Sequence, residues 1–320
     1  MSYDYLVLAL GAGTDYFGIP GLQEYGRTLK NLEDAMKIRE QIAEFIKDSP
    51  LGAKRTVLEP FSVVIGGAGA TGVEVAAELA YLFRSVPRER WKITIVEALP
   101  RVLSMFPNAL SQYAHEKLEK LGVHLMLDTC IKSVGGGDGR VEVVLAPRPL
   151  KPGEAESTLM CEFLPEKEKR MTAEFLLWAG GVRANPLIAK CGLPTDKKGR
   201  MEVDEHLQVK GLEKVFAIGD NALLIDPQSN QPVPATAQAA LWGGKIVAQN
   251  IKALITGTPL TLYHFKKFPA IVPLSGRDAV ALFGKLVIKG WPASFLRHAA
   301  DCRYFASVIG WMKAIKRCIM

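Results

Sequence analysis

The sequence has few cysteines, and none lies in a pattern that binds a metal or forms a redox pair. Its five cysteines are scattered along 320 residues without a C-x-x-C pair: Cys130, Cys161, Cys191, Cys302 and Cys318. This usage is typical of reduced cytosolic proteins. We therefore expect reduced thiols and no metal site.

A secretory signal and long apolar runs are also lacking. No uninterrupted apolar stretch reaches the roughly 18 residues that a membrane-spanning helix needs. A transmembrane protein is therefore not expected. Without spanning helices the chain would offer no proton path across a bilayer.

Acidic residues are scarce at the C-terminal end. From Lys285 onward, seven lysines and arginines accompany one acid, Asp301, so this segment carries +6 of the net charge of +7. A nucleic-acid enzyme would more often spread basic charge around a groove. A basic tail interleaved with Phe, Tyr and Trp suits an anionic membrane surface, although a solvated terminal helix would have a similar composition. We predict no nucleic-acid partner, and membrane association through Trp291–Met320. In that segment Gly310 is expected to interrupt a helix whose apolar residues recur at helical spacing: Phe295, Ala299, Cys302, Ala306 and Ile309.

The most informative stretch is a glycine loop between a predicted strand and a predicted helix, in SVVIGGAGATGVEVAAEL at 62–79. Gly67, Gly69 and Gly72 have the G-x-G-x-x-G spacing that lets a backbone approach a pyrophosphate at a helix N-terminus. The next predicted strand, KITIVEA, reaches Glu97, an acid placed to bind the adenosine ribose and to repel a 2'-phosphate. The pattern predicts an NADH site, and the alternative is a glycine-rich turn without a nucleotide.

Three other apolar segments have the character of buried strands, each ending in glycine or an acid: Tyr5–Leu10, Phe175–Gly181 and Val215–Asp220. The last could equally be a strand closed by a turn aspartate. Helical spacing predicts helices at 31–47 and 110–121, and a third with Thr236 or an adjacent residue near its N-cap. GGGDG at 135–139 predicts a hairpin turn. Alternating strands and helices indicate an α/β fold.

The motifs YDYLVLALGAGT, GGAGATGVE, LLWAGGV, VFAIGDNA and PATAQAALWGG, in this order, resemble the two-dinucleotide-binding-domain flavoproteins. The A-T-A-Q helix start and the basic aromatic tail resemble the type II NADH:quinone oxidoreductases. The resemblance implies two Rossmann-like domains followed by a tail. The FAD-binding domain would comprise 1–58 and 182–285, the NADH-binding domain 59–181, and the membrane-associated segment 286–320.

The same resemblance assigns cofactor contacts. Gly219 and Asp220 would contact FAD, with the carboxylate accepting hydrogen bonds from the ribityl chain, and Gly11 and Ala12 would pass close to the flavin nucleotide. The NADH contacts would be the glycine loop, the ribose acid and two glycines that let the nicotinamide approach: Gly67, Gly69, Gly72, Glu97, Gly180 and Gly181.

Two residues would act in catalysis. Glu74 corresponds to an acid near the nicotinamide and flavin, although an acid in a first helical turn can also stabilise the helix dipole. Ala237 and Gln238 would lie at a helix start beside the flavin on its quinone side. The family usually has a second Gln four residues later, where this sequence has Trp242.

Family members begin with another G-x-G-x-x-G loop for the FAD adenosine, and this sequence has none. We therefore expect a fragment without its N-terminal third, which binds NADH, retains FAD poorly and turns over little. The implied partners are NADH, a membrane quinone and an anionic lipid surface, and a homodimer is allowed. The implied location is peripheral, on the cytoplasmic face of a bacterial or archaeal plasma membrane, or on an organellar inner membrane.

The resemblance leaves two rival functions open. A sulfide:quinone oxidoreductase shares the fold and tail but needs a reactive cysteine pair, for which Cys161 and Cys302 are the candidates. A catalytically inactive, membrane-associated NAD-binding protein is the second.

Overall fold

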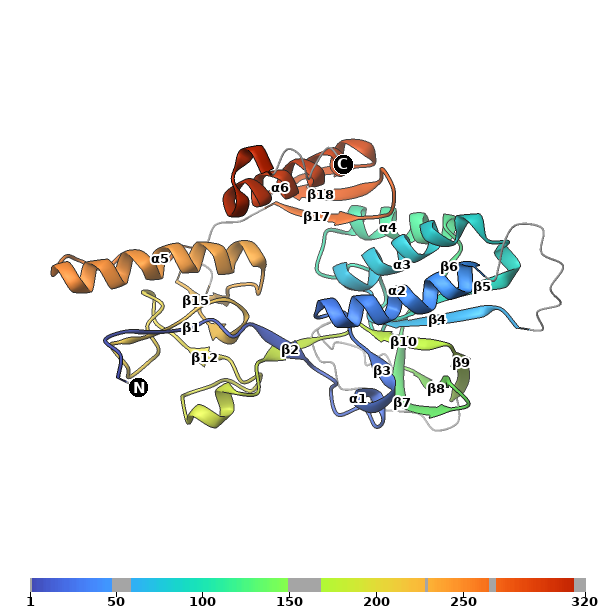
Figure 1. The fold of residues 1–320 in the computed structure, drawn as a ribbon, viewed down its shortest axis with the longest axis horizontal. Helices are drawn as coiled ribbons and strands as arrows, with labels where there is room; N and C mark the ends of the chain where they lie inside the picture. The colour runs from blue at the N-terminus through green and yellow to red at the C-terminus, as the bar shows by residue number, and fades with distance from the viewer. Residues whose placement is uncertain (1, 48–58, 149–167, 228–229, 265–268, 314–320) are drawn as a thin grey trace. The chain divides into compact units, whose positions relative to one another are not determined.

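A computed structural model describes residues 2–47, 59–148, 168–227, 230–264 and 269–313 (Figure 1). By its internal contacts the chain divides into two compact units. Unit 1 comprises Met1–Asp15 and Val182–Phe268, and unit 2 comprises Tyr16–Gly181 and Pro269–Met320.

Unit 2 is built on a five-stranded parallel sheet, which confirms the predicted α/β class. In spatial order its strands are β3 (Gly26–Arg27), β10 (Phe175–Trp178), β4 (Phe61–Gly66), β5 (Trp91–Val96) and β6 (Val123–Met126). Side chains of a strand alternate between the two faces of its sheet. Val63 and Ile65 of β4 accordingly enter one hydrophobic core, and Val64 enters another.

Three helices cover the Val63 face: α2 (Leu32–Lys47), α3 (Ala70–Leu82) and α4 (Asn108–Lys120). A three-stranded antiparallel sheet covers the Val64 face: β7 (Thr129–Gly137), β8 (Arg140–Pro147) and β9 (Lys169–Ala173). A short helix, α1 (Leu22–Tyr25), buries Leu22 in the same core as Val64. The parallel sheet is therefore covered on both faces, as its continuous apolar strands require.

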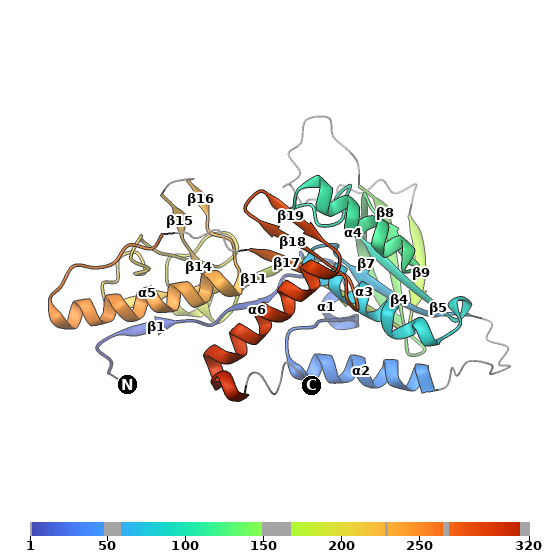
Figure 2. The same cartoon turned by 90° about the horizontal axis from the view of Figure 1, so that it is seen from above.

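The last part of unit 2 is a second antiparallel sheet with a helix against it: β17 (Ala270–Pro273), β18 (Ala279–Phe283), β19 (Leu286–Lys289) and α6 (Trp291–Ile309). Val272 and Val280 join the core around α3 and α4, whereas Ala279 and Ala281 pack with Ala293 of α6. Figure 2 shows α6 beginning beside this sheet and then extending away from it. Among the described residues, no helix combines the length and hydrophobicity needed to cross a bilayer.

Unit 1 contains short strands and one long helix. Strand β1 (Leu6–Leu8) pairs in parallel with β13 (Val215–Ala217), and β2 (Ala12–Thr14) pairs antiparallel with β11 (Val182–Ala184). Four further short strands lie among the described residues between Gly199 and Val233. β12 (Met201–Glu202) pairs in parallel with β14 (Ala222–Leu223), and β15 (Ile225–Asp226) forms a hairpin with β16 (Gln231–Pro232). The helix α5 (Ala237–Thr256) packs Ile246 and Val247 onto the core of this unit.

These groupings differ from the predicted domain limits. Residues 16–47, part of the predicted FAD-binding segment 1–58, pack in unit 2 because β3 pairs with β10 and α2 contributes Ile38 and Ile42 to the core. Residues 269–285 lie in unit 2 as well. The polar linker predicted at 49–59 lies almost wholly outside the described residues.

The structure also tests two local predictions, the hairpin turn and the state of the cysteines. The hairpin after Cys130 is present, but its turn lies at Asp138 and Gly139, which both have positive φ. Reduced cysteines were predicted, and this is wrong for Cys130 and Cys302, each of which is disulfide-bonded. Cys191 is a free thiol on the surface.

Phe83 gives a direct test of the unit 2 core. Its side chain is fully buried and its ring lies 5.7 Å from that of Trp91. Phe83→Ala should lower the free energy of unfolding of unit 2 by about 3–5 kcal/mol, through lost burial and a residual cavity. The neighbouring Leu82 is 47% exposed, so Leu82→Ala should cost less than about 1 kcal/mol. Hydrogen exchange of the β5 amides would measure the free energy of unfolding in both variants. Equal decreases in the two variants would contradict this packing.

Candidate functional site

The glycine loop lies at the carboxyl end of β4 and leads directly into α3. Gly67 has φ of +101°, and a Cβ there would lie 2.7 Å from the Cα of Gly180. At Gly72 a Cβ would lie 1.9 Å from the carbonyl oxygen of Gly67. Side chains are therefore excluded where the loop meets the β10 end and where it meets the first turn of α3.

Glu97 is tied to this loop. Its carboxylate accepts hydrogen bonds from the backbone N–H of Ala68, at 2.6 Å, and of Leu99, at 2.9 Å. The carbonyl of Val96 accepts from the N–H of Gly67 at 2.8 Å. The acid predicted to bind a ribose thus lies against the loop predicted to bind a pyrophosphate.

The third loop at this edge follows β10. The N–H of Ala179 donates to the carbonyl of Gly66 at 2.8 Å. Trp178, which the sequence reasoning did not single out, fixes the adjacent backbone. Its ring lies 2.5 Å from a Cβ built at Gly66 and 2.4 Å from one built at Gly180. Gly181 follows, half-buried.

This geometry fits an adenine dinucleotide. Gly69 is exposed, a Cβ built there would meet nothing within 4 Å, and within the described chain no side chain caps the start of α3. The helix amides and the open space beside Gly69 are what a bound pyrophosphate needs. The carboxyl edge of adjacent parallel strands is also where α/β sheets bind such ligands.

Glu74, in α3, lies near two charged residues of α6. Burial raises the pKa of its carboxyl group, the positive charge of Arg297 on α6 opposes this rise, and the charges of Glu78 and Asp301 add to it. Arg297 forms an ion pair with Asp301 at 3.0 Å. The Arg–Asp spacing of four residues was visible in the sequence, but its position near Glu74 depends on how α6 packs.

In unit 1 the ends of β1 and β13 carry the predicted flavin residues. Gly11 and Gly219 have φ of +66° and +73°. Asn221 holds these two ends together, because its buried amide accepts from the N–H of Gly11 at 3.2 Å and donates to the carbonyl of Leu8 at 3.0 Å. Sequence reasoning missed Asn221, although it directly follows Asp220. Ala12 pairs with Ala184 in the neighbouring two-stranded sheet.

The start of α5 adjoins the Gly219 loop. Thr236 caps this helix by accepting from the N–H of Ala239 at 3.2 Å, as predicted. A Cβ at Gly219 would lie 3.3 Å from that of Ala240. Ala237 and Gln238 are exposed at the first turn, and Trp242 packs against the unit 1 core. The residues of unit 1 thus fit a flavin nucleotide, with an exposed helix start beside two glycine-bearing strand ends.

Sequence comparison finds relatives along nearly the whole chain. The sequence model of the pyridine nucleotide-disulphide oxidoreductase family matches residues 1–244. A type II NADH:quinone oxidoreductase of Staphylococcus haemolyticus is 28% identical over 321 residues, covering 98% of this chain and 74% of that protein. Its counterpart in Staphylococcus aureus is 29% identical over 322 residues with the same coverage.

Among solved structures, NDH2 from Plasmodium falciparum in complex with NADH is similar to this chain with a TM-score of 0.80. The two are 18% identical, and the similarity covers 100% of this chain and 78% of the other. At this identity the match shows the fold.

Two glycines of the loop should respond differently to the same substitution. Gly69→Ala places a methyl group in open space at φ of −68°, so stability should change by less than about 0.5 kcal/mol. The methyl group would occupy pyrophosphate space, so NADH affinity should fall at least about tenfold. Gly72→Ala drives a methyl group into the carbonyl of Gly67 and should destabilise the chain by about 1–3 kcal/mol or more. Thermal unfolding measures the stability of each variant, and calorimetry measures its affinity for NADH. An unchanged NADH affinity in Gly69→Ala would contradict the pyrophosphate assignment.

Proposed function

The chain belongs to the pyridine nucleotide-disulphide oxidoreductase family, and we propose that it is a type II NADH:quinone oxidoreductase. In this proposal it passes hydride from NADH to FAD and two electrons on to a membrane quinone, without pumping protons. The relatives that carry this name cover nearly all of the chain.

One observation carries the nucleotide part of the proposal. The Glu97 carboxylate lies 2.6 Å from the backbone nitrogen of Ala68, inside the glycine loop. An acid held there would accept hydrogen bonds from the adenosine ribose and would repel a 2'-phosphate. In this proposal Gly67, Gly69 and Gly72 form the NADH pyrophosphate site.

FAD supplies the acceptor for the hydride and the donor for the quinone, and the protein orients both partners and excludes water. Gly11, Ala12, Gly219 and Asp220 contact the flavin nucleotide. Asn221 sets the spacing of those contacts through its bonds to Gly11 and Leu8. Ala237 and Gln238 present the positive end of the α5 dipole to negative charge on the reduced flavin.

On the nicotinamide side, Gly180 and Gly181 leave room for the ring, and Glu74 lies near the reacting cofactors. Because burial raises its pKa, Glu74 keeps its proton to a higher pH than a solvated glutamate does. A protonated carboxyl group beside the flavin can supply a proton during quinone reduction.

Peripheral membrane binding through the C-terminal segment is also part of the proposal. The structure exposes several large apolar side chains there: Trp291, Phe295, Val308, Trp311 and Met312. The predicted apolar stripe is not one exposed face, since Ala306 is buried. The helix ends at Ile309 and Gly310 caps it, as predicted.

A quinone reductase assay tests the overall activity. The full chain, supplied with FAD, NADH and a short-chain quinone and no sulfide, should oxidise NADH with one quinone reduced per NADH. Quinone reduction that required sulfide would favour the sulfide:quinone rival. NADH binding with no quinone reduction would favour the inactive NAD-binding protein.

Cofactor choice should depend on Glu97. We expect a higher kcat/KM for NADH than for NADPH, because the carboxylate repels the 2'-phosphate. Glu97→Gln should narrow this preference by roughly tenfold, equivalent to about 1.4 kcal/mol. Glu89→Gln, on an exposed residue of the preceding loop, is the matched control and should leave the ratio unchanged. Equal values for the two cofactors in the wild-type protein would refute the role of Glu97.

Vesicle binding should depend on the exposed face of α6. Trp291 and Phe295 are 71% and 66% exposed and lie one helical turn apart. Changing both to Ala should weaken binding to vesicles containing an anionic lipid at least about tenfold, since each side chain buries apolar area in the interface. Met105→Ala, at a 92% exposed position outside the segment, should have no effect. Co-sedimentation measures this, and equal binding of the double variant would show that α6 is not the anchor.

A further inference from the structure

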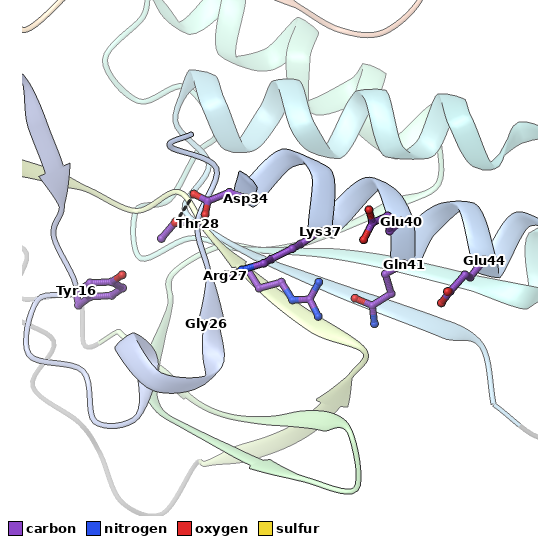
Figure 3. A pocket seen from close by; sticks show the side chains of 9 residues that line it. All are labelled: Tyr16, Gly26, Arg27, Thr28, Asp34, Lys37, Glu40, Gln41 and Glu44. Atoms are coloured by element: carbon purple, nitrogen blue, oxygen red, sulfur yellow. Dashed lines mark hydrogen bonds between the residues drawn. The ribbon is translucent and has the colours of Figure 1, made fainter. Parts of the chain in front are cut away.

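Unit 2 contains a cavity that the proposed oxidoreductase site does not use. It has a volume of about 630 Å³ and lies between β3 and the first three turns of α2 (Figure 3). The side chains that matter for its chemistry are Tyr16, Arg27, Lys37, Glu40, Gln41 and Glu44. A volume of this size is in the range of small-molecule sites, roughly 300–1,000 Å³.

Arg27 places a poorly compensated positive charge in the cavity. Its guanidinium carbon lies 5.1 Å from the ring centroid of Phe175, a fully buried residue of β10. Burial lowers the pKa of Arg27, and no carboxylate in the described part of the chain forms an ion pair with it. A half-buried guanidinium without a carboxylate partner favours pairing with another anion.

The acids nearby do not supply that anion. The Asp34 carboxylate accepts hydrogen bonds from the hydroxyl of Thr28, at 2.7 Å, and the N–H of Lys30, at 2.9 Å. Glu40 and Glu44 are exposed on α2, and their charges do not figure among the causes of the Arg27 shift.

Lys37 brings a second positive charge to the same opening. Its amine pairs with Glu33 at 2.7 Å, and this hydrogen bond raises the pKa of Lys37 while the charge of Arg27 opposes the rise. Arg27 and Lys37 are therefore close enough to repel one another. An anion between them would relieve that repulsion.

Gln41 adds a hydrogen-bond acceptor. Its side-chain oxygen is buried and has no donor among the described residues. Figure 3 shows Gln41 extending from α2 toward Arg27, which extends from β3. A buried amide oxygen without a donor is destabilising, and a ligand hydroxyl or ammonium group would supply the missing hydrogen bond.

We propose that this cavity binds a small ligand that carries an anionic group, carboxylate or phosphate, together with hydroxyl or ammonium donors. The anionic group pairs with the guanidinium of Arg27, with Lys37 at the opening. The donor reaches the side-chain oxygen of Gln41, and the charges of Glu40 and Glu44 favour an ammonium group over a second anion. The proposal is independent of the NADH:quinone oxidoreductase function.

Calorimetry on the full chain tests the site with three probes. 4-Aminobutyrate carries one carboxylate and one ammonium group, glucose 6-phosphate carries a phosphate and hydroxyls, and inorganic phosphate carries the anion alone. At least one of the first two should bind at least about tenfold more tightly than inorganic phosphate. The order of the probe affinities identifies whether the site prefers a carboxylate or a phosphate, and an ammonium or a hydroxyl donor. If none of the three binds to the wild-type protein, the proposal is overturned.

Substitutions in the cavity lining test whether the probe binds in this cavity. Arg27→Met should lower the affinity for the probe that binds the wild-type protein at least about tenfold, because a hydrogen bond to a charged group is lost. Gln41→Met should bring its affinity close to that of inorganic phosphate. Lys30→Met, at an exposed side chain outside the cavity lining, is the control and should bind as the wild type does. NADH affinity should stay constant throughout, which checks folding, and unchanged probe binding in Arg27→Met would contradict the site.

Discussion

The backbone contact between the glycine loop and its neighbours is the constraint on which unit 2 depends. The loop crosses the carboxyl edge of the sheet with no room for a Cβ at Gly67 or Gly72, so β4, β10 and the start of α3 approach at backbone distance. The Glu97 carboxylate then bonds to the loop from the end of β5. Replacing any of these contacts with a side chain would separate the elements that the nucleotide must touch together.

In unit 1 a side chain, rather than a backbone contact, holds the strand ends together. The parallel strands β1 and β13 are only three residues long, so they offer few backbone hydrogen bonds to fix their ends. The buried Asn221 amide, which follows β13, joins it to the end of β1 through hydrogen bonds with Gly11 and Leu8. A buried amide with both its donor and its acceptor in use specifies a single arrangement, since any other leaves it unsatisfied.

Much of this could be predicted because the informative signals are local. The glycine spacing and the cap at Thr236 depend on neighbours within a few residues. The acid at Glu97 could be predicted because it comes at the end of the strand that follows the glycine loop and its helix. Three things could not be predicted. β3 has only two residues, too few for a periodic pattern, so its pairing with β10 and the grouping of 16–47 with unit 2 were invisible.

The other two depend on tertiary packing. The proximity of Arg297 to Glu74 exists only because α6 packs on the β17–β19 sheet. The cavity at Arg27 needs the edge strand, Phe175 beneath the guanidinium, and α2 beside it. In each case the residues in contact are far apart in the sequence and belong to separate elements. The periodicity of one segment does not predict such contacts.

Electron transfer from NADH through a bound flavin to a quinone is the central claim, and an anaerobic titration tests it most directly. The full chain, loaded with FAD, is titrated with NADH and then with a short-chain quinone while the flavin absorbance is followed. The account predicts loss of the oxidised flavin band at one NADH per flavin and its return with one quinone. A band that NADH leaves unchanged, or that NADH bleaches and quinone fails to restore, would contradict it.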